Sequence, residues 1–516
     1  MSSGIVTSAC AHRPSAATHD DLSAIQPPFV EPPAPPLTSP SPAPAVPLYV
    51  DLDGTLFPGD TLHESVLLLL RRNPLNLLRL LLWLFQGKLH FKRRLADAVR
   101  PDPATLPYHS AFLDFLRAEH VSGRRLVLAT AADHRIAAEV AQHLGVFDDH
   151  MGSQDVNLSG AHKLAAIRLH SGGAFAYAGN GAVDLVVWQH SAEAVAVNTP
   201  PGVQRRLNAL HPQARVFKRE PLRLRTLLKA IRLTQWSKNT LVFVPLLASH
   251  VTSAQAWGAV LGAFVAFGLC ASATYLFNDL LDLPNDRRHA HKRKRPLAAG
   301  LLGVGPALTM AAALLTAGLV LALAISPALA AMLSGYLAIT LAYSVYLKSL
   351  ALFDVLLLAG LYTWRIAAGA VVAQVTLSNW LLAFSMFIFL SLALVKRCAE
   401  LEEMNDTEAT RTPGRGYHLE DLATLRGMGV CSGFLAVLVL ALYIESQNGR
   451  ALYPQPLWLW ALVPLLLAWV MRMWLKVARR ELHGEDPIAF ALKDAASWVT
   501  LLAMTGAALL ASRGAS

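Results

Sequence analysis

The pattern of hydrophobic positions divides the chain into two parts, one with short apolar runs and one with long apolar segments. From Pro47 to about Ala196, short apolar runs alternate with helical stretches, whereas from about Leu241 long apolar segments follow one another almost to the end. The first pattern predicts an α/β domain with a parallel sheet, and the second predicts helices that cross a membrane. We therefore expect a multidomain chain, in which an α/β domain with a small helical cap precedes an all-α membrane domain.

Four apolar runs are the strand candidates of the α/β part. They lie at 46–50, 125–129, 174–178 and 194–197. Between the first two, the stretch 67–85 is strongly apolar but is interrupted by three arginines and Pro74. It is too broken to span a bilayer, so it predicts the helical cap, with the membrane surface as one candidate for what that cap contacts.

About nine apolar segments predict the transmembrane helices. They lie at roughly 239–252, 256–278, 305–325, 327–346, 352–373, 378–395, 427–445, 456–472 and 495–512. Basic residues gather in alternate loops, and by the positive-inside rule those loops face the cytoplasm. We therefore expect a multi-pass protein of the inner (plasma) membrane, with the α/β domain in the cytoplasm and the C-terminus on the opposite side.

The segments outside these two patterns complete the division into domains. Residues 1–47 are rich in Pro, Ala and Ser and are predicted to be disordered, and residues 199–238 form a basic, membrane-proximal connector. The α/β domain then occupies 48–198 and the membrane domain 239–512. The net charge is +10, but the cations lie beside apolar segments. Lipid headgroups explain that placement better than nucleic acid does.

Two carboxylates follow the first predicted strand, in the string Leu48-Tyr-Val-Asp51-Leu-Asp53-Gly-Thr55. The carboxyl ends of parallel strands are where α/β sheets bind ligands. At such an edge Asp51 can attack phosphorus, while Asp53 can protonate the leaving group and then activate water. A turn without catalytic function is the alternative for this string alone.

With Thr130, Lys163 and the string Gly179-Asn180-Gly-Ala-Val-Asp184, this part resembles the haloacid dehalogenase (HAD) superfamily of Rossmann-like phosphatases. The resemblance implies that Asp51 is the nucleophile and Asp53 the acid/base, both also binding Mg²⁺ together with Asp184. It implies that Thr130 and Lys163 bind the phosphate, and for Asp184 it leaves open whether the carboxylate binds the metal directly or holds its ligands. Asn180 stands where the family usually has Asp, which removes one anion from the magnesium shell. A HAD fold that has lost catalysis and acts as a scaffold is therefore the alternative.

A second group of carboxylates ends the second predicted span. Asp279, Asp282 and Asp286 fall at i, i+3 and i+7, so on a continuous helix they share one face at the cytoplasmic boundary. Anions so placed repel one another and are costly at membrane depth. Mg²⁺ held by carboxylates and substrate phosphates would compensate them. The group predicts a catalytic diphosphate site, and a span end wetted by the cytoplasm is the alternative.

The membrane part resembles the UbiA superfamily of intramembrane prenyltransferases from about residue 225 to 512. Within it, the sequence is most similar to the decaprenyl-phosphate phosphoribosyltransferases. The strings that carry the resemblance are Gln235-Trp236-Ser-Lys238-Asn239, Asn278-Asp279-x-x-Asp282-x-x-x-Asp286, Tyr343-Ser344-Val-Tyr-Leu-Lys348, Lys396-Arg397-x-x-Glu400 and Gly484-Glu485-Asp486-Pro487. The resemblance implies a Mg²⁺-dependent transferase that acts on a polyprenyl phosphate or diphosphate.

The charges around the fifth predicted span favour one substrate class. Aromatic prenyltransferases usually carry a second aspartate-rich motif there, whereas this chain has Asp354 with Lys348 and Arg365. One carboxylate with two cations suits a phosphorylated sugar better than a neutral ring. The sequence thus predicts transfer of 5-phosphoribose from phosphoribosyl diphosphate to a polyprenyl phosphate, after which the HAD domain could dephosphorylate the lipid-linked product.

The candidate substrate ligands of the membrane part come from these strings, and for each cation a role in setting topology is the alternative. They are Lys238, Asn278, Arg287, Lys292, Arg295, Tyr343, Lys348, Asp354 and Arg365. Two other functions stay open for the whole chain. One is an aromatic prenyltransferase that uses a polyprenyl diphosphate, and the other is a transporter or non-catalytic scaffold.

Overall fold

The computed structural model describes residues 46–218, 223–289, 291–404, 415–482 and 487–512. The tail predicted at 1–47 therefore lies almost entirely outside the described residues. The same is true of Gly484, Glu485 and Asp486, which the sequence analysis singled out.

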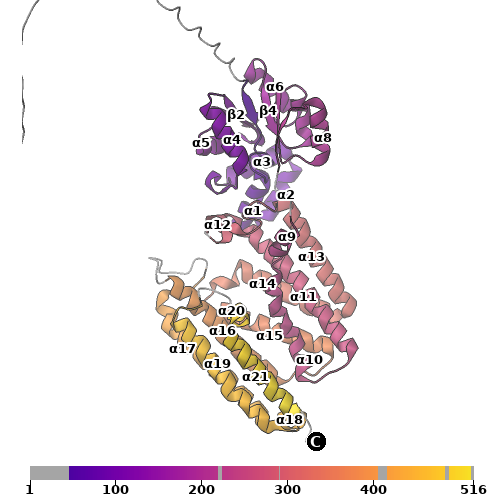
Figure 1. Cartoon of the computed structure of the whole chain (residues 1–516), viewed down its shortest axis with the longest axis vertical. Helices are drawn as coiled ribbons and strands as arrows, with labels where there is room; N and C mark the ends of the chain where they lie inside the picture. The colour runs from indigo at the N-terminus through magenta and orange to yellow at the C-terminus, as the bar shows by residue number, and fades with distance from the viewer. Residues whose placement is uncertain (1–45, 219–222, 290, 405–414, 483–486, 513–516) are drawn as a thin grey trace, which may run out of the picture. The chain divides into compact units, whose positions relative to one another are not determined.

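The α/β part is built on a six-stranded parallel sheet with the strand order β3-β2-β1-β4-β5-β6; Figure 1 shows two of its strands, β2 and β4, among the helices of this part. The strands are β1 (Leu48–Val50), β2 (Leu126–Asp133), β3 (Asp149–Ser153), β4 (Ala176–Gly179), β5 (Glu193–Val197) and β6 (Arg215–Phe217). The predicted parallel sheet is confirmed, with all four expected strands in it. β3 and β6 were not anticipated, because β3 is polar and β6 is three residues long. β6 lies within the segment expected as a basic connector.

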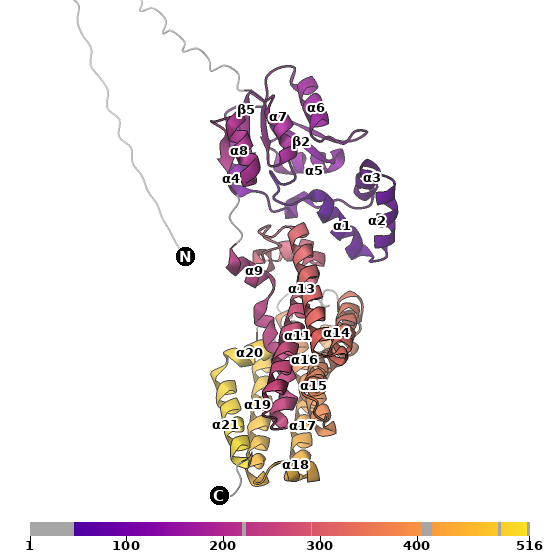
Figure 2. The same cartoon turned by 90° about the vertical axis from the view of Figure 1, so that its right-hand side faces the viewer.

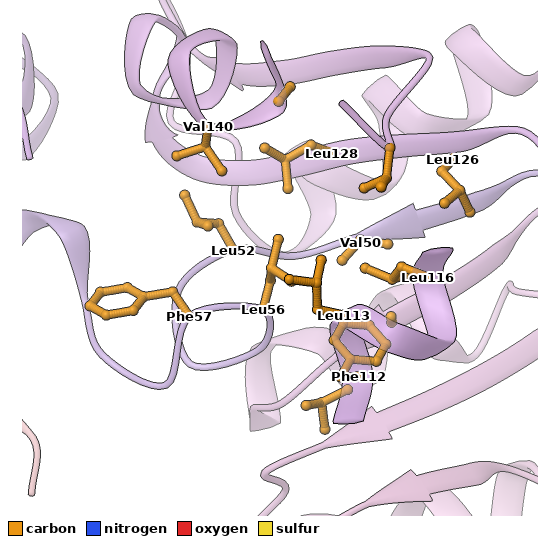
Figure 3. Close-up of a cluster of buried hydrophobic side chains, with 14 of the residues drawn as sticks. Val50, Leu52, Leu56, Phe57, Phe112, Leu113, Leu116, Leu126, Leu128 and Val140 are labelled. Atoms are coloured by element: carbon orange, nitrogen blue, oxygen red, sulfur yellow. The ribbon is translucent and has the colours of Figure 1, made fainter. Parts of the chain in front are cut away.

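Helices cover both faces of the sheet, and alternate residues of each strand point to opposite faces. Leu48 and Val50 of β1 pack on one side with Phe112 and Leu116; Figure 3 shows Val50 beside the last two. Tyr49 packs on the other side, with Tyr177 and Trp188 among its neighbours. The helices of this part are α4 (Ser110–Val121), α5 (His134–Leu144), α6 (Ala161–Ser171), η2 (Ala182–Asp184), α7 (Leu185–Trp188) and α8 (Pro201–Leu210).

The stretch between β1 and α4 forms helices, as the interrupted apolar pattern predicted. They are α1 (Thr61–Arg72), α2 (Asn76–Phe85), α3 (Lys88–Ala98) and the 3-10 turn η1 (Pro103–Thr105). Leu69, Leu80, Phe91 and Leu95 form a small core among α1, α2 and α3. This core is separate from the one under the sheet, so the three helices make a cap of their own.

Eight helices of the described residues are long and apolar enough to cross a membrane (Figure 2). They are α11 (Ala254–Leu281), α13 (Val304–Ile325), α14 (Pro327–Val345), α15 (Phe353–Ala373), α16 (Asn379–Met404), α17 (Leu422–Glu445), α19 (Leu462–Ala478) and α21 (Ala495–Ser512). Short elements connect them, namely α12 (Leu283–Arg288), η4 (Lys292–Lys294), η5 (Leu347–Ser349), η6 (Leu419–Asp421), α18 (Gln447–Leu452), η7 (Pro456–Ala461) and α20 (Pro487–Lys493). The all-α membrane domain is thereby confirmed.

The first predicted span does not form a helix of that length. Residues 239–252 are divided between the 3-10 helix η3 (Leu233–Phe243), which follows α9 (Leu224–Ala230), and the short helix α10 (Val244–Ala248). Pro245 explains the break, because proline lacks a backbone N–H and is tolerated only in the first turn of a helix. The prediction of about nine such helices was therefore one too high for the described residues. The side of the membrane predicted for the C-terminus depends on nine crossings, and it stays a prediction, as does the cytoplasmic side of the α/β domain.

η3 is nevertheless packed tightly into the helical part. Trp236 donates its indole N–H to the hydroxyl of Ser272 on α11, at 2.9 Å. Its ring lies over Gly268, where a Cβ atom would come within 2.5 Å of the ring. Only glycine allows this approach, so η3 is fixed against α11 and places Lys238 at the inner cavity described below.

Candidate functional site

The strand-end site lies where β1, β2 and β4 finish at the same edge of the sheet. Val50 is in register with Leu128 of β2 and Ala178 of β4, so the residues that follow these three meet. Asp51, the first residue after β1, is buried, and its Oδ1 accepts a hydrogen bond from Lys163 Nζ at 2.8 Å. The structure thus brings together two residues that are far apart in the sequence.

A buried polar chain continues from Lys163 to the loop after β4. Lys163 Nζ also donates to the hydroxyl of Tyr177 at 3.0 Å, and that hydroxyl donates to Asp184 Oδ1 at 2.7 Å. Asp184 Oδ2 accepts the backbone N–H groups of Asn180 at 3.0 Å and Gly181 at 2.9 Å. Both oxygens of Asp184 therefore hold the loop in place through hydrogen bonds. A metal ion bound by Asp184 would have to use oxygens that already accept these hydrogen bonds. Tyr177 was not anticipated, since a tyrosine inside an apolar strand reads as core.

Asp53 lies at the start of the cap. Its Oδ1 accepts the backbone N–H of Thr61 at 2.7 Å, and its Oδ2 accepts the Thr61 hydroxyl at 3.1 Å, at the N-terminal end of α1. The turn that follows Asp53 requires glycine at position 54 for two reasons. Gly54 has a φ of +77°, and a Cβ atom there would come within 2.0 Å of the Asn180 side-chain nitrogen. The Asn180 amide is therefore packed against the turn that carries the two carboxylates.

Thr130 and one residue of the cap complete this site. Thr130 is fully buried, and its hydroxyl oxygen accepts the N–H of Ala132 at 3.1 Å, so its hydrogen can still be donated. Lys92 of α3 donates to the carbonyl of Ala131 at 2.6 Å and to Asn157 Oδ1 at 2.8 Å. Sequence reasoning missed Lys92, because nothing distinguishes it within the basic helix α3.

Burial sets the proton affinities of the two carboxylates. It raises the pKa of Asp51 to about 6, although the Lys163 ammonium acts in the opposite direction. Burial, followed by the charge of Asp60, raises the pKa of Asp53 to about 7. A group with a pKa near neutrality can both give and take a proton at physiological pH. The environment of Asp53 therefore suits the acid/base role that the sequence predicted.

A second site lies inside the helical part, as a cavity of about 240 Å³. Five cationic side chains line it, and no Asp or Glu is among the described residues around it. The cations are Lys238, Arg365, Lys396, Arg397 and Arg415. Hydroxyl and amide groups from Thr274, Tyr275, Asn278, Tyr336, Thr340, Tyr343, Ser344 and Tyr362 accompany them. Such a lining favours a ligand that carries phosphate groups.

Arg365 is one of the cations held on several sides. Its Nε donates to Asn239 Oδ1 at 3.0 Å, and its Nη2 donates to the Tyr336 hydroxyl at 2.5 Å. Its Nη1 donates to the carbonyl of Leu361 at 2.8 Å, and the guanidinium also lies over the ring of Tyr362. A charge buried within membrane-spanning helices and held on several sides is a functional group by default.

Asp354 lies behind the cavity lining rather than in it. It is fully buried and accepts hydrogen bonds from Arg397 Nε at 2.6 Å and from the Tyr417 hydroxyl. Arg397 donates in turn to Glu400 at 2.6 Å and to the Tyr343 hydroxyl at 3.1 Å. The structure therefore places Arg397, and not Asp354, where a ligand would be touched. Asp354 positions that arginine.

Two of the three carboxylates at the end of the second predicted span form ion pairs with arginines. Asp279 accepts hydrogen bonds from Arg232 and, at 3.2 Å, from Arg295, which also bonds to Asp286 at 2.5 Å. The expected continuous helix is interrupted, because α11 ends at Leu281 and Asp282 lies between it and the separate helix α12. None of the three carboxylates is among the residues lining the cavity, although the neighbouring Asn278 is.

No group of three or more His, Cys, Asp or Glu side chains that could hold a metal is found among the described residues. The three carboxylates therefore do not form a complete metal cage by themselves. Carboxylate and amide oxygens are still the ligand types that Mg²⁺ prefers, and Mg²⁺ is usually bound by one or two carboxylates together with substrate phosphates and waters. The carboxylate and amide groups at this site therefore fit Mg²⁺, provided that substrate phosphates and waters supply its other ligands.

The remaining predicted ligands lie outside the cavity lining. Lys292 is in η4 and Lys348 is in η5. Arg287 forms a two-point ion pair with Glu64 of α1, at 2.8 and 3.1 Å, and both side chains are nearly buried. Arg287 thus joins the cap to the end of the helical part instead of facing the cavity.

Replacing Glu64 by glutamine is expected to destabilise this contact by about 3 to 5 kcal/mol, because Arg287 is left charged, buried and without its counter-ion. Hydrogen exchange of the α1 amides in detergent micelles would measure the loss. Asp102→Asn is the matched control, since Asp102 pairs with Arg288 in an exposed ion pair, worth about 0 to 1 kcal/mol. Equal exchange in the two variants would contradict a structural role of the buried pair.

Comparison with known proteins identifies relatives of both the helical part and the whole chain. Residues 240–493 match the UbiA prenyltransferase family. The protein y4nM of Sinorhizobium fredii is 38% identical over 459 residues, which cover 88% of each chain. The decaprenyl-phosphate phosphoribosyltransferase of Mycolicibacterium smegmatis is 38% identical over 188 residues, which cover 36% of this chain and 59% of that protein. A solved UbiA homolog from Archaeoglobus fulgidus, bound to GPP and Mg²⁺, aligns over 55% of this chain and 99% of its own with 18% identity and a TM-score of 0.42.

Proposed function

Because residues 240–493 belong to the UbiA prenyltransferase family, we propose that the membrane part transfers 5-phosphoribose from phosphoribosyl diphosphate to a polyprenyl phosphate. The observation that carries this proposal is the cavity lining, with five cations and no carboxylate among the described residues. Both proposed substrates bring phosphate groups to the reaction, whereas an aromatic acceptor would bring none. The similarity to decaprenyl-phosphate phosphoribosyltransferases supports the same choice over a part of that protein's length.

The cations would act on the charges of the reacting groups. In the proposed step a phosphate oxygen of the lipid forms a bond to the anomeric carbon, and the bond from that carbon to the diphosphate breaks. Arg365 and Arg397 are each held by several partners before any substrate arrives. Fixed donors of this kind stabilise developing charge without reorganising during the reaction. The two arginines would therefore bind and neutralise the phosphates at either end of the transfer.

Mg²⁺ is the proposed cofactor of the membrane part. Asp279, Asp282 and Asp286 would hold it together with substrate phosphates, and Asn278 would reach the same phosphates from the cavity side. Bound Mg²⁺ would neutralise the diphosphate that departs. Arg232 and Arg295 already balance two of the carboxylates, so they keep these anions together in the protein before substrate binds.

The α/β part is proposed to be a HAD-type phosphatase that removes the 5-phosphate from the lipid-linked product. Asp51 would attack phosphorus as the bond from phosphorus to the ribose 5-oxygen breaks, and Asp53 would protonate that oxygen so that it leaves as a hydroxyl. Asp53 would then take a proton from the water that attacks the aspartyl phosphate, which releases inorganic phosphate and frees Asp51. Thr130 and Lys163 would bind the phosphate, and Asp184 would hold Mg²⁺ together with the two catalytic carboxylates. The raised pKa of Asp53 supports the acid/base role. For both steps to follow one another, the two parts must face the same side, which we propose is the cytoplasm at the plasma membrane.

One experiment tests both activities. The purified full chain in lipid vesicles is given polyprenyl phosphate and labelled phosphoribosyl diphosphate, and the lipids are analysed by mass spectrometry. We expect a ribosyl lipid together with inorganic phosphate and diphosphate. Consumption of a polyprenyl diphosphate with an aromatic acceptor, and no use of phosphoribosyl diphosphate, would instead identify an aromatic prenyltransferase.

The Mg²⁺ requirement of phosphate release is expected to depend on pH. Asp51 and Asp53 have pKa values raised to about 6 and about 7, so below these values protons compete with the metal for the carboxylates. The Mg²⁺ concentration that gives half-maximal phosphate release should therefore rise as the pH falls from about 8 to about 5. Below the pKa of a carboxyl that must lose its proton to bind Mg²⁺, the rise should be roughly tenfold per pH unit for each such carboxyl. A requirement that is constant over this range would contradict metal binding at these carboxylates.

A further inference from the structure

Helix α2 presents an apolar surface that the described part of the protein leaves uncovered. Within Asn76–Phe85 only Asn76 and Leu80 are buried. The large apolar side chains of α2 and of Leu75 before it that remain exposed, by 46 to 89%, are Leu75, Leu77, Leu78, Leu81, Leu82, Leu84 and Phe85. A helix that is apolar almost all round is normally enclosed by a protein core or by lipid. So large an exposed apolar patch marks a site of interaction.

The charges beside α2 indicate what covers it. From Ser65 to Ala96 the chain contains no Asp or Glu. It contains seven cations in that stretch, namely Arg71, Arg72, Arg79, Lys88, Lys92, Arg93 and Arg94. An apolar helix flanked by cations is the composition of helices that lie in the interface of a bilayer with anionic headgroups.

Contacts of the preceding helix bring α2 to the membrane-spanning part. Leu67 of α1 packs in one core with Leu276 and Leu280, at the end of α11. One turn earlier, Glu64 forms the buried ion pair with Arg287. Only three residues, 73–75, separate α1 from α2, and three extended residues reach at most about 11 Å. α2 therefore begins close to the point where α1 contacts the end of a membrane-spanning helix.

We propose that α2 is inserted into the lipid–water interface of the bilayer that surrounds the helical part, where it anchors the cap. α2 lies in sequence between the two cap helices that bear on the strand-end site, α1 through Thr61 and α3 through Lys92. Anchoring α2 holds both at the membrane surface. If the proposed function holds, this is where a lipid-linked phosphate would be presented to Asp51.

Spin labels on the full chain in vesicles test the anchor without requiring any activity. The four native cysteines are replaced by alanine, and a nitroxide is attached at Leu78→Cys or Leu82→Cys. Leu169→Cys on α6, where the native side chain is 88% exposed, is the matched control. In vesicles of phosphatidylethanolamine and phosphatidylglycerol, we expect the ratio of collisions with oxygen to collisions with a water-soluble nickel chelate to be at least about fivefold higher at 78 and 82 than at 169, because oxygen concentrates in lipid and the chelate does not.

The other outcomes would overturn the proposal. A ratio equal to that of the control would show that α2 faces water. Few collisions with either reagent would show that protein covers it, and dipolar broadening between labels would show that a second copy does. In vesicles of phosphatidylcholine alone we expect the ratio to fall at least about twofold, and an unchanged ratio would contradict the role of the cations.

Discussion

Replacing Arg365 by methionine is expected to lower kcat/KM for phosphoribosyl transfer by about 10² to 10³-fold, the usual cost of removing one preorganised donor from developing charge. Arg365 is fixed at the cavity by Asn239, Tyr336 and Leu361. Methionine keeps much of the side-chain length but has no charge and no N–H donors. Initial rates with labelled phosphoribosyl diphosphate in vesicles would measure the loss.

Two further variants make the Arg365 result specific. Lysine at this position keeps the charge but loses the planar fork of donors, so we expect Arg365→Lys to recover only a part of the activity. Arg450→Met is the control, because Arg450 is likewise held by a partner, the Glu445 carboxylate, but is exposed and lies outside the cavity lining. If Arg365→Met transfers phosphoribose within about threefold of the unaltered chain, the cationic cavity is not where the phosphates bind.

The fold of the α/β part could be predicted because it depends on local patterns. The four expected strands are short apolar runs, and a parallel sheet brings their carboxyl ends to one edge whatever the loops between them contain. The register of β1 with β2 and β4 accordingly brings the ends of these strands together, next to Asp51, Thr130 and the loop that carries Asp184. The roles of these three residues, which the HAD resemblance implied, stay predictions. What the pattern does not contain is the geometry of individual side chains, such as the use of both Asp184 oxygens to hold the loop at Asn180.

The inner site of the membrane part was less predictable, because its partners come from distant segments. Arg232 and Asp279 are 47 positions apart, and Arg397 and Asp354 are 43 apart. The spacing of acids in one segment indicates that cations are needed, but not which cations supply the charge. Asp354 was therefore expected to touch substrate, whereas the structure places Arg397 at the cavity. Similarly, a spacing of three and four residues predicts a shared face only if the helix continues, and here it breaks at Asp282.

Replacing Asp51 by asparagine is expected to reduce release of inorganic phosphate at least about 10³-fold while transfer continues, so that a phosphoribosyl lipid accumulates. The amide has no negative charge with which to attack phosphorus. Its oxygen can still accept the hydrogen bond from Lys163, so the fold should be retained. Mass spectrometry of the lipids, together with a phosphate assay on the same sample, would separate the two activities.

The control for Asp51→Asn is a carboxylate of the same sheet that does not belong to the site. Asp133, at the end of β2, is also buried, but it caps α5 and pairs with Arg135. Asp133→Asn should therefore lower stability without causing the phosphorylated lipid to accumulate. If phosphate release survives in Asp51→Asn, the phosphate is removed elsewhere. The buried chain from Asp51 through Lys163 to Asp184 would then be part of a scaffold, as the replacement of the usual aspartate by Asn180 also allows.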